Sequence, residues 1–544
     1  MENWRVPLPK ETLAHLAARQ LASRLWARDT SVFAAAQDPA VREAIEHRLG
    51  WLDAPGGMVL YLAEIEGVAA SVHRDGLNQV CLLGMGGSSL CAEVLRLTLA
   101  APEIRGRMQV LDTTDERAVR TVTSTLNPAE TLFMVASKSG STVEVTALEA
   151  YFRGWVETAV GTRAGQHFIA ITDPGTSLVT HASAHGYRHT FINPADIGGR
   201  YSALSLFGLV SAALMDISPA KLLAHGVDMA GACRVDSLTN PGLTLGAFMA
   251  TQAQAGRDKL TLLLPPSLAP LGLWIEQLVA ESTGKLGRGI LPVVDEPPAN
   301  PEAYDLDRAF VMVSPPGEAK AARKLAALTR AGHPVFHLET TPDQLGAEFF
   351  RWEFATAIAG AILDVNPFDE PNVRDAKTRT TAMLDGPRPL VISPPLTERD
   401  GFLERAHRPA AARLPGPGTF VALLDYLPLD DRRSETVAHI RAHISALTGS
   451  ATTYGLGPRY LHSTGQFHKG GANNGFFILL TGDDATETAV PGANYSFSTL
   501  KHAQALGDFE ALAANDRHVV HVHIPDKDAD FSAELEKVVR AQFT

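Results

Sequence analysis

Residues 131–136 of the chain read Thr-Leu-Phe-Met-Val-Ala, and residues 137–142 read Ser-Lys-Ser-Gly-Ser-Thr, directly before a helical pattern that starts at about Val143. The unbroken apolar run predicts a parallel strand that is buried on both faces. The turn after it offers main-chain N–H groups, hydroxyl groups and a helix N-terminus to one anion, and small side chains let a phosphate approach closely. The stretch therefore predicts an α/β unit that binds a small molecule carrying a phosphate.

Similar strand-then-helix units surround this stretch and predict an α/β fold. The strands of a first series are expected at Gln79–Leu83, Met108–Leu111, Thr131–Ala136, His167–Ile171 and Arg188–Phe191. A second series has expected strands at Leu260–Leu264, Ala309–Val313 and Pro334–Leu338, and helices at Leu268–Ser282 and Leu345–Leu363. Such alternation indicates parallel sheets covered by helices on both faces. We expect an N-terminal helical segment at 1–48 and two doubly wound domains in series, at 49–230 and 231–386.

The last part of the chain has a different pattern. Proline- and glycine-rich stretches mark a linker at 387–418. Beyond it, the order of elements is strand 419–425, helix 432–447, strands 451–456 and 475–480, helix 498–513 and strand 517–523. The order βαββαβ is typical of a ferredoxin-like domain. We therefore expect a C-terminal α+β domain at 419–544.

Composition narrows the class of partner. The chain has 544 residues and a net charge of −12, which argues against nucleic acid as the main partner but allows a local basic pocket. Cys81, Cys91 and Cys233 are an odd number without CxxC spacing, so we expect no disulfide framework and a cytoplasmic location. The N-terminus lacks a signal-peptide pattern and no run is long enough to cross a bilayer, so no membrane partner is expected.

Three more motifs carry candidate chemistry. Residues 84–89, Gly-Met-Gly-Gly-Ser-Ser, follow a strand and permit close ligand approach, although they lack GxGxxG spacing and a plain tight turn is the alternative. In 198–202, Gly-Gly-Arg-Tyr-Ser, Arg200 offers several fixed donors to an anion, with a surface arginine as the alternative. In 277–285, Gln-Leu-Val-Ala-Glu-Ser-Thr-Gly-Lys, Glu281 ends an apolar helix and is a candidate general base, with a solvated helix-end glutamate as the alternative.

These motifs, taken together and in this order, resemble those of the phosphoglucose isomerase family. The resemblance continues at 366–377, Asn-Pro-Phe-Asp-Glu-Pro-Asn-Val-Arg-Asp-Ala-Lys, and runs from about residue 75 to the C-terminus. The segment 454–471 resembles the isomerase portion of bifunctional transaldolase/phosphoglucose isomerase, while no segment is typical of the transaldolase barrel. The resemblance implies that both α/β domains are of the sugar-isomerase (SIS) type, that the chain forms a homodimer, and that it needs neither metal nor cofactor.

The resemblance also implies a role for each matching residue. For substrate binding, it implies that Gly87 and Ser88 flank the sugar, that Ser137, Ser139 and Thr142 hold the phosphate with Lys138 in the loop, and that Gln277 lines the pocket. For catalysis, it implies that Arg200 stabilises an enediolate and that Glu281 moves a proton between two carbons. Lys377 is expected to assist ring opening. These residue types suit aldose–ketose isomerisation, in which one carboxylate removes and returns a proton while a cation stabilises negative oxygen.

Two positions depart from the family pattern. Glu370 stands where the family signature has glutamine, and an added carboxylate beside a phosphorylated sugar is unfavourable unless it is paired or points away. The ring-opening histidine is also missing from its usual place, where His333 and His337 match a packed strand instead. We hypothesise that His468, in a polar C-terminal segment, supplies this function, with His462 as the second choice.

The predicted function is interconversion of glucose 6-phosphate and fructose 6-phosphate through an enediolate. One alternative is a dual isomerase that also accepts mannose 6-phosphate, since Thr283 could position a water molecule near Glu281. Another alternative is a sugar-phosphate-binding regulatory module. An isomerase is distinguished from such a regulatory module by Glu281, Arg200 and Lys377, because a sensor needs the phosphate loop but no residue that moves a proton.

Overall fold

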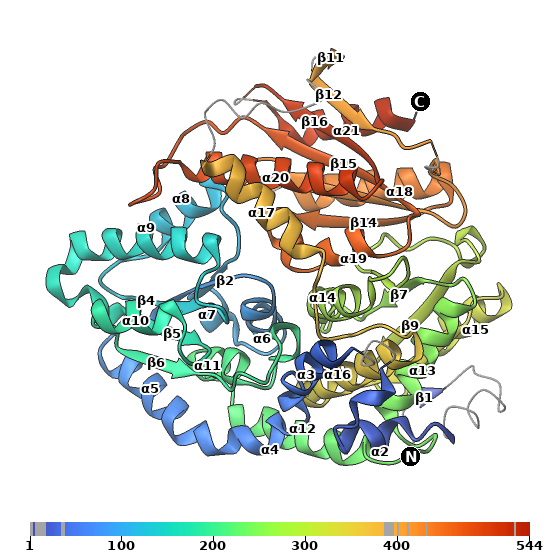
Figure 1. Ribbon diagram of the computed structural model, residues 1–544, viewed down its shortest axis with the longest axis horizontal. Helices are drawn as coiled ribbons and strands as arrows, with labels where there is room; N and C mark the ends of the chain where they lie inside the picture. The colour runs from blue at the N-terminus through green and yellow to red at the C-terminus, as the bar shows by residue number, and fades with distance from the viewer. Residues whose placement is uncertain are drawn as a thin grey trace.

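Three β-sheets with flanking helices make up the protein (Figure 1). The computed structural model describes residues 4–5, 18–33, 38–385, 396–399, 402–410, 413–430, 432–526 and 529–543. Parts of the predicted N-terminal segment and of the predicted linker lie outside these ranges.

The first sheet confirms the predicted parallel arrangement of strands, with strand order β3-β2-β4-β5-β6. Its strands are β2 (Gln79–Gly84), β3 (Met108–Leu111), β4 (Thr131–Ala136), β5 (Phe168–Thr172) and β6 (His189–Ile192). The helices between them are α6 (Leu90–Thr98), α7 (Pro102–Arg105), α8 (Glu116–Thr125), α9 (Val143–Val160) and α10 (Ser177–Ala184). Every residue of β4 is buried, as its apolar run predicts for a central strand.

The second sheet has the order β1-β10-β9-β7-β8. Its parallel strands are β7 (Lys259–Leu263), β8 (Leu291–Val293), β9 (Arg308–Ser314) and β10 (Val335–Glu339), and α15 (Ala319–Arg330) connects the last two. The short strand β1 (Trp4–Arg5) pairs antiparallel with β10 at the edge. Sequence reasoning missed β1 and β8 because two or three residues are too few to show an alternating pattern.

Helices join the two α/β domains through one shared core. They are α11 (Leu206–Leu214), α12 (Pro219–Ala232), α13 (Pro241–Gln254), α14 (Leu271–Thr283) and α16 (Leu345–Ile362). Helix α16 is buried along its whole length and packs against α12, α13 and α14. The N-terminal helices are α2 (Leu21–Trp26), α3 (Pro39–Glu46), α4 (Ala54–Gly57) and α5 (Leu62–Arg74); in Figure 1, α2, α4 and α5 lie along the lower edge and α3 lies further in.

The C-terminal domain contains a mixed six-stranded sheet in the order β11-β12-β16-β15-β13-β14. Its strands are β11 (Thr397–Arg399), β12 (Phe402–His407), β13 (Phe420–Tyr426), β14 (Ala451–Leu456), β15 (Gly475–Gly482) and β16 (His518–Ile524). Strands β13 to β16 run parallel, and β12 adds antiparallel to β16. Side chains of alternate residues pack on α18 (Arg433–Thr448) and α21 (Phe531–Phe543) on one face, and on α19 (Gly465–Gly470) and α20 (Phe497–Ala514) on the other.

The ferredoxin-like topology predicted for this domain is wrong. A ferredoxin-like sheet pairs its neighbouring strands antiparallel, whereas β13 pairs parallel with both β14 and β15. The reason lies in the segment between β14 and β15, for which the sequence pattern predicts no helix. It holds the 3-10 helix η10 (Arg459–His462) and α19, so it is a crossover that brings β15 back parallel to β13.

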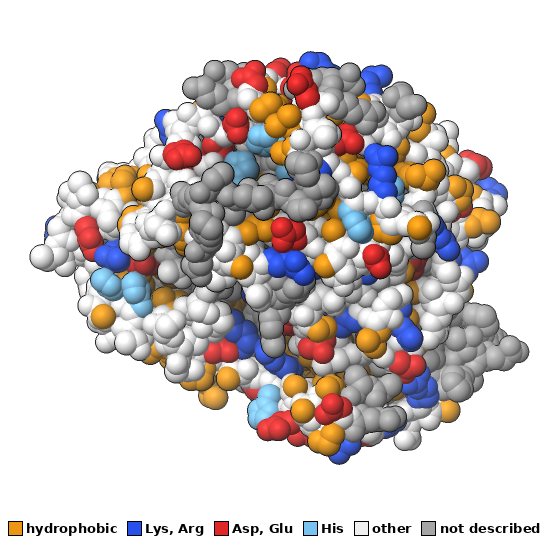
Figure 2. Space-filling model, turned by 45° about the horizontal axis from the view of Figure 1, so that its top comes forward, with side chains coloured by type: hydrophobic (Ala, Val, Ile, Leu, Met, Phe, Trp, Pro, Cys, Tyr) orange, Lys and Arg blue, Asp and Glu red, His pale blue; other side chains and the backbone are white. Residues whose placement is uncertain are grey.

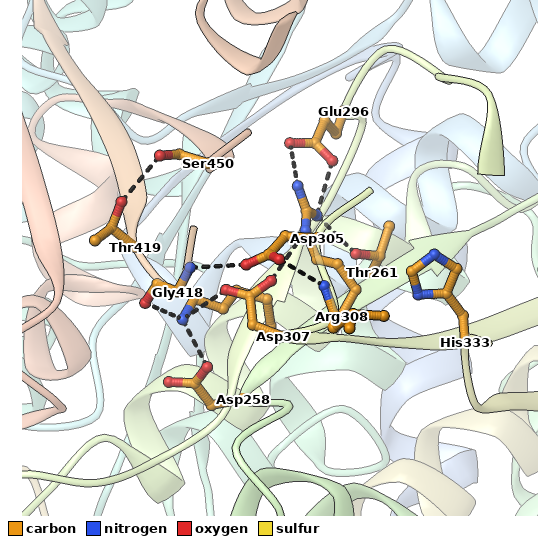
Figure 3. A network of polar contacts seen from close by, with 12 residues as sticks. Asp258, Thr261, Glu296, Asp305, Asp307, Arg308, His333, Gly418, Thr419 and Ser450 are labelled. Carbon is orange, nitrogen blue, oxygen red and sulfur yellow. Dashed lines mark hydrogen bonds and ion pairs between the residues drawn. The ribbon is translucent and has the colours of Figure 1, made fainter. Parts of the chain in front are cut away.

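The C-terminal domain contacts both α/β domains and lies above them in Figure 1. Arg459 donates two hydrogen bonds to Asp112 of the first domain, each of 2.7 Å. Lys259 of the second domain donates to the Gly418 carbonyl oxygen at 2.9 Å, within a buried network of charged side chains (Figure 3). Two further helices complete the contact, α17 (Val373–Asp385) and α20, which pack against each other.

The surface is mixed in charge. On the face in Figure 2, acidic and basic side chains are interspersed. Among the residues that the structure describes, no helix combines the length and the apolar character needed to cross a membrane.

Candidate active site

A cavity of ≈ 500 Å³ lies where the carboxyl ends of β2 and β4 face α14, α17 and η10. This is the edge of a parallel sheet at which ligands bind. Nine of the predicted site residues line the cavity: Gly87, Ser88, Lys138, Ser139, Thr142, Arg200, Gln277, Glu281 and Lys377. They come from loops and helices that are far apart in the sequence. Ser137 and His468 are not among its lining residues.

Glu281 is held on the buried side of the cavity. Its residue is 8 % exposed, and its Oε2 atom accepts a hydrogen bond of 3.2 Å from Nε2 of Gln277, one helical turn earlier on α14. The same Gln277 nitrogen donates to the main-chain oxygen of His462 at 2.7 Å, which ties α14 to the C-terminal domain. Burial raises the pKa of Glu281, although Arg200 acts in the opposite direction. A carboxylate with a raised pKa is a stronger base, as proton removal from carbon requires.

Arg200 is buried beside Glu281, in the 3-10 helix η7 (Gly199–Tyr201). Its Nη1 atom lies 3.6 Å from Oε1 of Glu281 and 3.1 Å from Oε2 of Glu370. Burial alone would lower the pKa of Arg200, but the two carboxylates outweigh burial, so its pKa is raised and the guanidinium stays charged. A fixed cation next to the base can stabilise negative charge that develops on oxygen.

The predicted phosphate loop contributes Lys138, Ser139 and Thr142 to the lining of the cavity. Gly140 adopts φ +68°, which glycine tolerates, and Thr142 is the N-cap residue of α9. The hydroxyls of Ser139 and Thr142 line the cavity, whereas the Ser137 hydroxyl hydrogen-bonds to that of Thr142 at 3.0 Å from behind. Ser137 therefore supports the loop from the side of the neighbouring groove between α9 and α10.

Lys138 reaches across the loop rather than standing free. Its ammonium group pairs with Asp173 and donates to the Ala195 carbonyl oxygen at 3.2 Å. Burial lowers the pKa of Lys138 and raises that of Asp173. The pair lines the same end of the cavity as the loop hydroxyls.

Two glycine-containing loops that line the cavity, the one after β2 and the one before Arg200, are in close backbone contact. A Cβ atom at Gly87 would collide with the carbonyl oxygen of Gly199, so the loop after β2 can approach the turn before Arg200 only with glycine. Lys377, on α17, also lines the cavity and is an exposed residue.

His462 lines the cavity, and the first choice, His468, does not. Nε2 of His462 lies 2.8 Å from Oε1 of Glu144, in the first turn of α9. Burial by itself would raise the pKa of Glu144, but His462 and Lys377 outweigh burial and lower it to about 2. Glu144 therefore stays ionised and orients the imidazole ring. Gln504 of α20 donates to the same Glu144 oxygen at 2.6 Å.

His468 is packed inside the C-terminal domain. Its residue is 2 % exposed, and its ring centroid lies 5.1 Å from that of Phe477 and 5.9 Å from that of Tyr460. Burial lowers its pKa well below the ordinary value, which favours the neutral ring. The polarity of the surrounding sequence was misleading because the segment forms the buried helix α19.

Thr283 does not face the cavity. Its hydroxyl donates to the Val279 carbonyl oxygen at 2.8 Å and accepts from the Ile290 N–H at 2.9 Å. Both contacts are inside the domain, so nothing in this arrangement positions a water molecule near Glu281.

Sequence reasoning missed Glu144, Asp173 and Arg48, which belong to the site or its lining. Glu144 was detectable in principle, because a carboxylate two residues after a phosphate loop needs a cationic partner. Arg48 and Asp173 follow no motif, and only the fold brings them to the cavity.

A pair of α/β domains with a hydroxyl-rich loop, a buried carboxylate and a buried arginine in one cavity defines the sugar-isomerase class. A family model described as phosphoglucose isomerase matches residues 66–285. A glucose-6-phosphate isomerase from Carboxydothermus hydrogenoformans is 30% identical over 383 residues, which cover 59% of this chain and 82% of that protein. The chain belongs to the phosphoglucose isomerase family.

Solved structures agree on the fold. A hypothetical protein from Thermus thermophilus has a TM-score of 0.57 at 24% sequence identity and covers 70% of this chain and 100% of that one. A glucose-6-phosphate isomerase from Chlamydia trachomatis has a TM-score of 0.54 at 17% identity and covers 70% of this chain and 88% of that one.

Proposed function

We propose that this protein interconverts glucose 6-phosphate and fructose 6-phosphate. The observation that carries the proposal is the convergence of Glu281, Arg200 and the hydroxyl-rich loop on one cavity. A sugar-phosphate sensor would need the loop but would gain nothing from a buried carboxylate of raised pKa beside a buried arginine. The relatives that carry the isomerase name support the same reaction.

The phosphate end of the substrate is assigned to the loop before α9. Ser139 and Thr142 present hydroxyls there, and the N-terminus of α9 adds main-chain N–H groups and the positive end of the helix dipole. Because Lys138 is paired with Asp173, its contribution is a neutralised pair rather than a free cation.

Ring opening is assigned to His462 and Lys377. The bond between the anomeric carbon and the ring oxygen (C1–O5 in glucose 6-phosphate, C2–O5 in fructose 6-phosphate) breaks when one group delivers a proton to the ring oxygen and another accepts the proton of the anomeric hydroxyl. Both side chains line the cavity, and Glu144 holds the imidazole of His462 in place. His462 belongs to the same chain as Glu281, so one chain supplies both parts of the chemistry.

Isomerisation follows on the open chain. The Glu281 carboxylate removes the proton from C2 of the aldehyde and returns it to C1, while the proton of the C2 hydroxyl passes to O1; together the two transfers move the carbonyl from C1 to C2. The enediolate between these steps carries negative charge on oxygen, and Nη1 of Arg200 faces the space beside Glu281 where that charge develops. Gly87 and Ser88 form the wall beside the sugar.

The test is an assay of the purified chain with fructose 6-phosphate, in which a dehydrogenase specific for glucose 6-phosphate reports the product. We expect turnover, and its absence in the folded protein would reject the proposal. Mannose 6-phosphate is the second substrate to test. We expect little conversion of it, because Thr283 is occupied inside its own domain.

Two finer predictions belong with this function. The first is a homodimer, which the family resemblance implies. The second is a cytoplasmic location, which the pattern of cysteines favours, and the three cysteines are free and buried in the structure. Light scattering of the purified chain measures its oligomeric state. Because the cavity combines residues of one chain, we expect activity per chain to be independent of dilution.

A further inference from the structure

Arg200 has most of its donors committed to the protein. Its Nε atom donates to the hydroxyl of Ser282 at 2.8 Å, and its Nη2 atom donates to the carbonyl oxygens of Pro367 at 2.9 Å and Asp369 at 2.8 Å. These bonds use three of the five N–H groups of the guanidinium. Only Nη1 remains to meet a reacting oxygen.

Two carboxylates share that nitrogen. Glu370 accepts from Nη1 at 3.1 Å, and Oε1 of Glu281 lies 3.6 Å from it. The Glu370 side chain is 44 % exposed toward the cavity that it lines, while the Glu281 side chain is 10 % exposed. One cation therefore stands between a buried base and a more exposed carboxylate.

The charges around this pair come from several elements. Arg48 precedes the first domain and Lys285 follows α14, and both act on Glu370 together with Arg200. Lys285 is itself paired with Asp369 at 2.9 Å. Burial would raise the pKa of Glu370, but these cations lower it, so Glu370 is ionised at neutral pH.

The same surroundings act differently on the base. Burial raises the pKa of Glu281 most strongly, the negative charge of Glu370 raises it further, and Arg200, Lys285 and His462 oppose the rise. Like charges at such close range cannot ionise independently, so the proton affinity of Glu281 depends on whether position 370 is charged.

We infer that Glu370 is a positioning residue of the catalytic centre, which holds Nη1 of Arg200 and strengthens Glu281 as a base. The inference rests on the proposed isomerase function. It also gives a reason for the carboxylate at a position where the family signature carries a neutral glutamine. In the substrate-free enzyme, the ion pair with Arg200 offsets the unfavourable negative charge of Glu370. Because the Glu370 side chain is partly exposed, it can move away when a substrate oxygen approaches Nη1.

The experiment compares the pH dependence of kcat/KM for fructose 6-phosphate in the unaltered chain, Glu370→Gln and Glu370→Asp. The base must be ionised, so activity falls as the pH drops through the pKa of Glu281. Removing the charge at 370 lowers that pKa, so we expect the acid limb of Glu370→Gln to move about one unit toward lower pH. Glu370→Asp keeps the charge, so its kcat/KM should fall at the same acidic pH as that of the unaltered chain.

Two controls make the comparison specific. The phosphate of the substrate also titrates near pH 6, but it does so equally in every variant and cancels between them. Glu103→Gln makes the same charge change at an exposed site on α7, outside the cavity, and should leave the limb unmoved.

The outcomes separate the two proposals. A folded but inactive unaltered chain would reject the isomerase function itself. An active unaltered chain with an unmoved acid limb in Glu370→Gln would overturn the role of Glu370 alone, as would an equal shift in Glu103→Gln. A shift in Glu370→Gln that Glu370→Asp reverses supports it.

Discussion

Glu281 shows how one residue gains its chemistry from its neighbours. The burial that raises its pKa, the amide of Gln277 and the guanidinium of Arg200 all come from side chains that the fold packs around it. A glutamate at the end of an exposed helix would have none of them and would be a weak base at neutral pH.

Glu281→Gln tests this residue directly. The amide cannot accept the proton from carbon, so we expect turnover to fall by about 10³-fold or more while the phosphate ligand still binds. Coupled-assay rates and equilibrium binding of fructose 6-phosphate measure the two effects. Glu276→Gln is the matched control on α14, because burial raises the pKa of Glu276 to about 8 and its side chain lies outside the cavity. Retained turnover in Glu281→Gln would remove Glu281 from the mechanism.

His462→Asn tests the ring-opening group. The substitution keeps the main-chain oxygen that accepts from Gln277 but removes the imidazole that Glu144 orients. We expect kcat with cyclic fructose 6-phosphate to fall by roughly 10²-fold. His468→Asn is the comparison, since its ring lies outside the cavity. If His468→Asn lost the isomerase activity and His462→Asn kept it, the two assignments would be reversed.

At the scale of elements, two tight loops decide whether the site can form. The 3-10 helix η5 (Gly86–Ser88) is in backbone contact with η7, and this contact places Gly87 and Ser88 beside Arg200. Neither loop is long, and each is anchored by a buried strand or helix next to it. The geometry of the cavity therefore depends on small residues more than on flexible side chains.

Gly87→Ala tests that contact. The added Cβ would collide with the carbonyl oxygen of Gly199, so the two loops must separate. We expect kcat/KM to drop by about 10²-fold, since small misplacements of catalytic groups are costly. Gly154→Ala is the control within α9, where a Cβ meets nothing within 4 Å and should be neutral or stabilising. Steady-state kinetics and circular dichroism compare the two variants. An unchanged kcat/KM in Gly87→Ala would contradict the prediction.

At the scale of the whole molecule, the C-terminal domain supplies part of the lining of the candidate cavity. It is fixed to the first domain by Arg459 on Asp112. It is fixed to the second by the bond from Lys259 to the Gly418 carbonyl oxygen and by Glu296, which accepts from the Thr452 N–H and pairs with Arg308 (Figure 3). The same domain carries η10, whose last residue is His462. Attachment at both sides therefore sets where the imidazole stands relative to Glu281.

Lys259→Met tests the attachment to the second domain. Lys259 is 1 % exposed and pairs with Asp258 at 2.7 Å and Asp307 at 3.0 Å, so its loss leaves the buried Asp307 with only Arg308, 3.9 Å away, as a cationic neighbour. We expect the free energy of unfolding to fall by roughly 3 kcal/mol, measured by chemical denaturation. Lys320→Met, at an exposed position of α15, should change it by less than about 0.5 kcal/mol. Equal stability of the two variants would show that the network contributes nothing.

The sequence by itself determined the parallel α/β architecture and most of the site. Long apolar runs such as 131–136 must be buried on both faces, and glycine, hydroxyl and charged residues at their carboxyl ends mark the ligand edge, because these are local signals. Tertiary structure alone decided the direction of β15, which of His462 and His468 lines the cavity, and the pairing of Glu370 with Arg200. These depend on contacts between residues far apart in the chain, and local pattern carries no information about which distant side chain will lie opposite another.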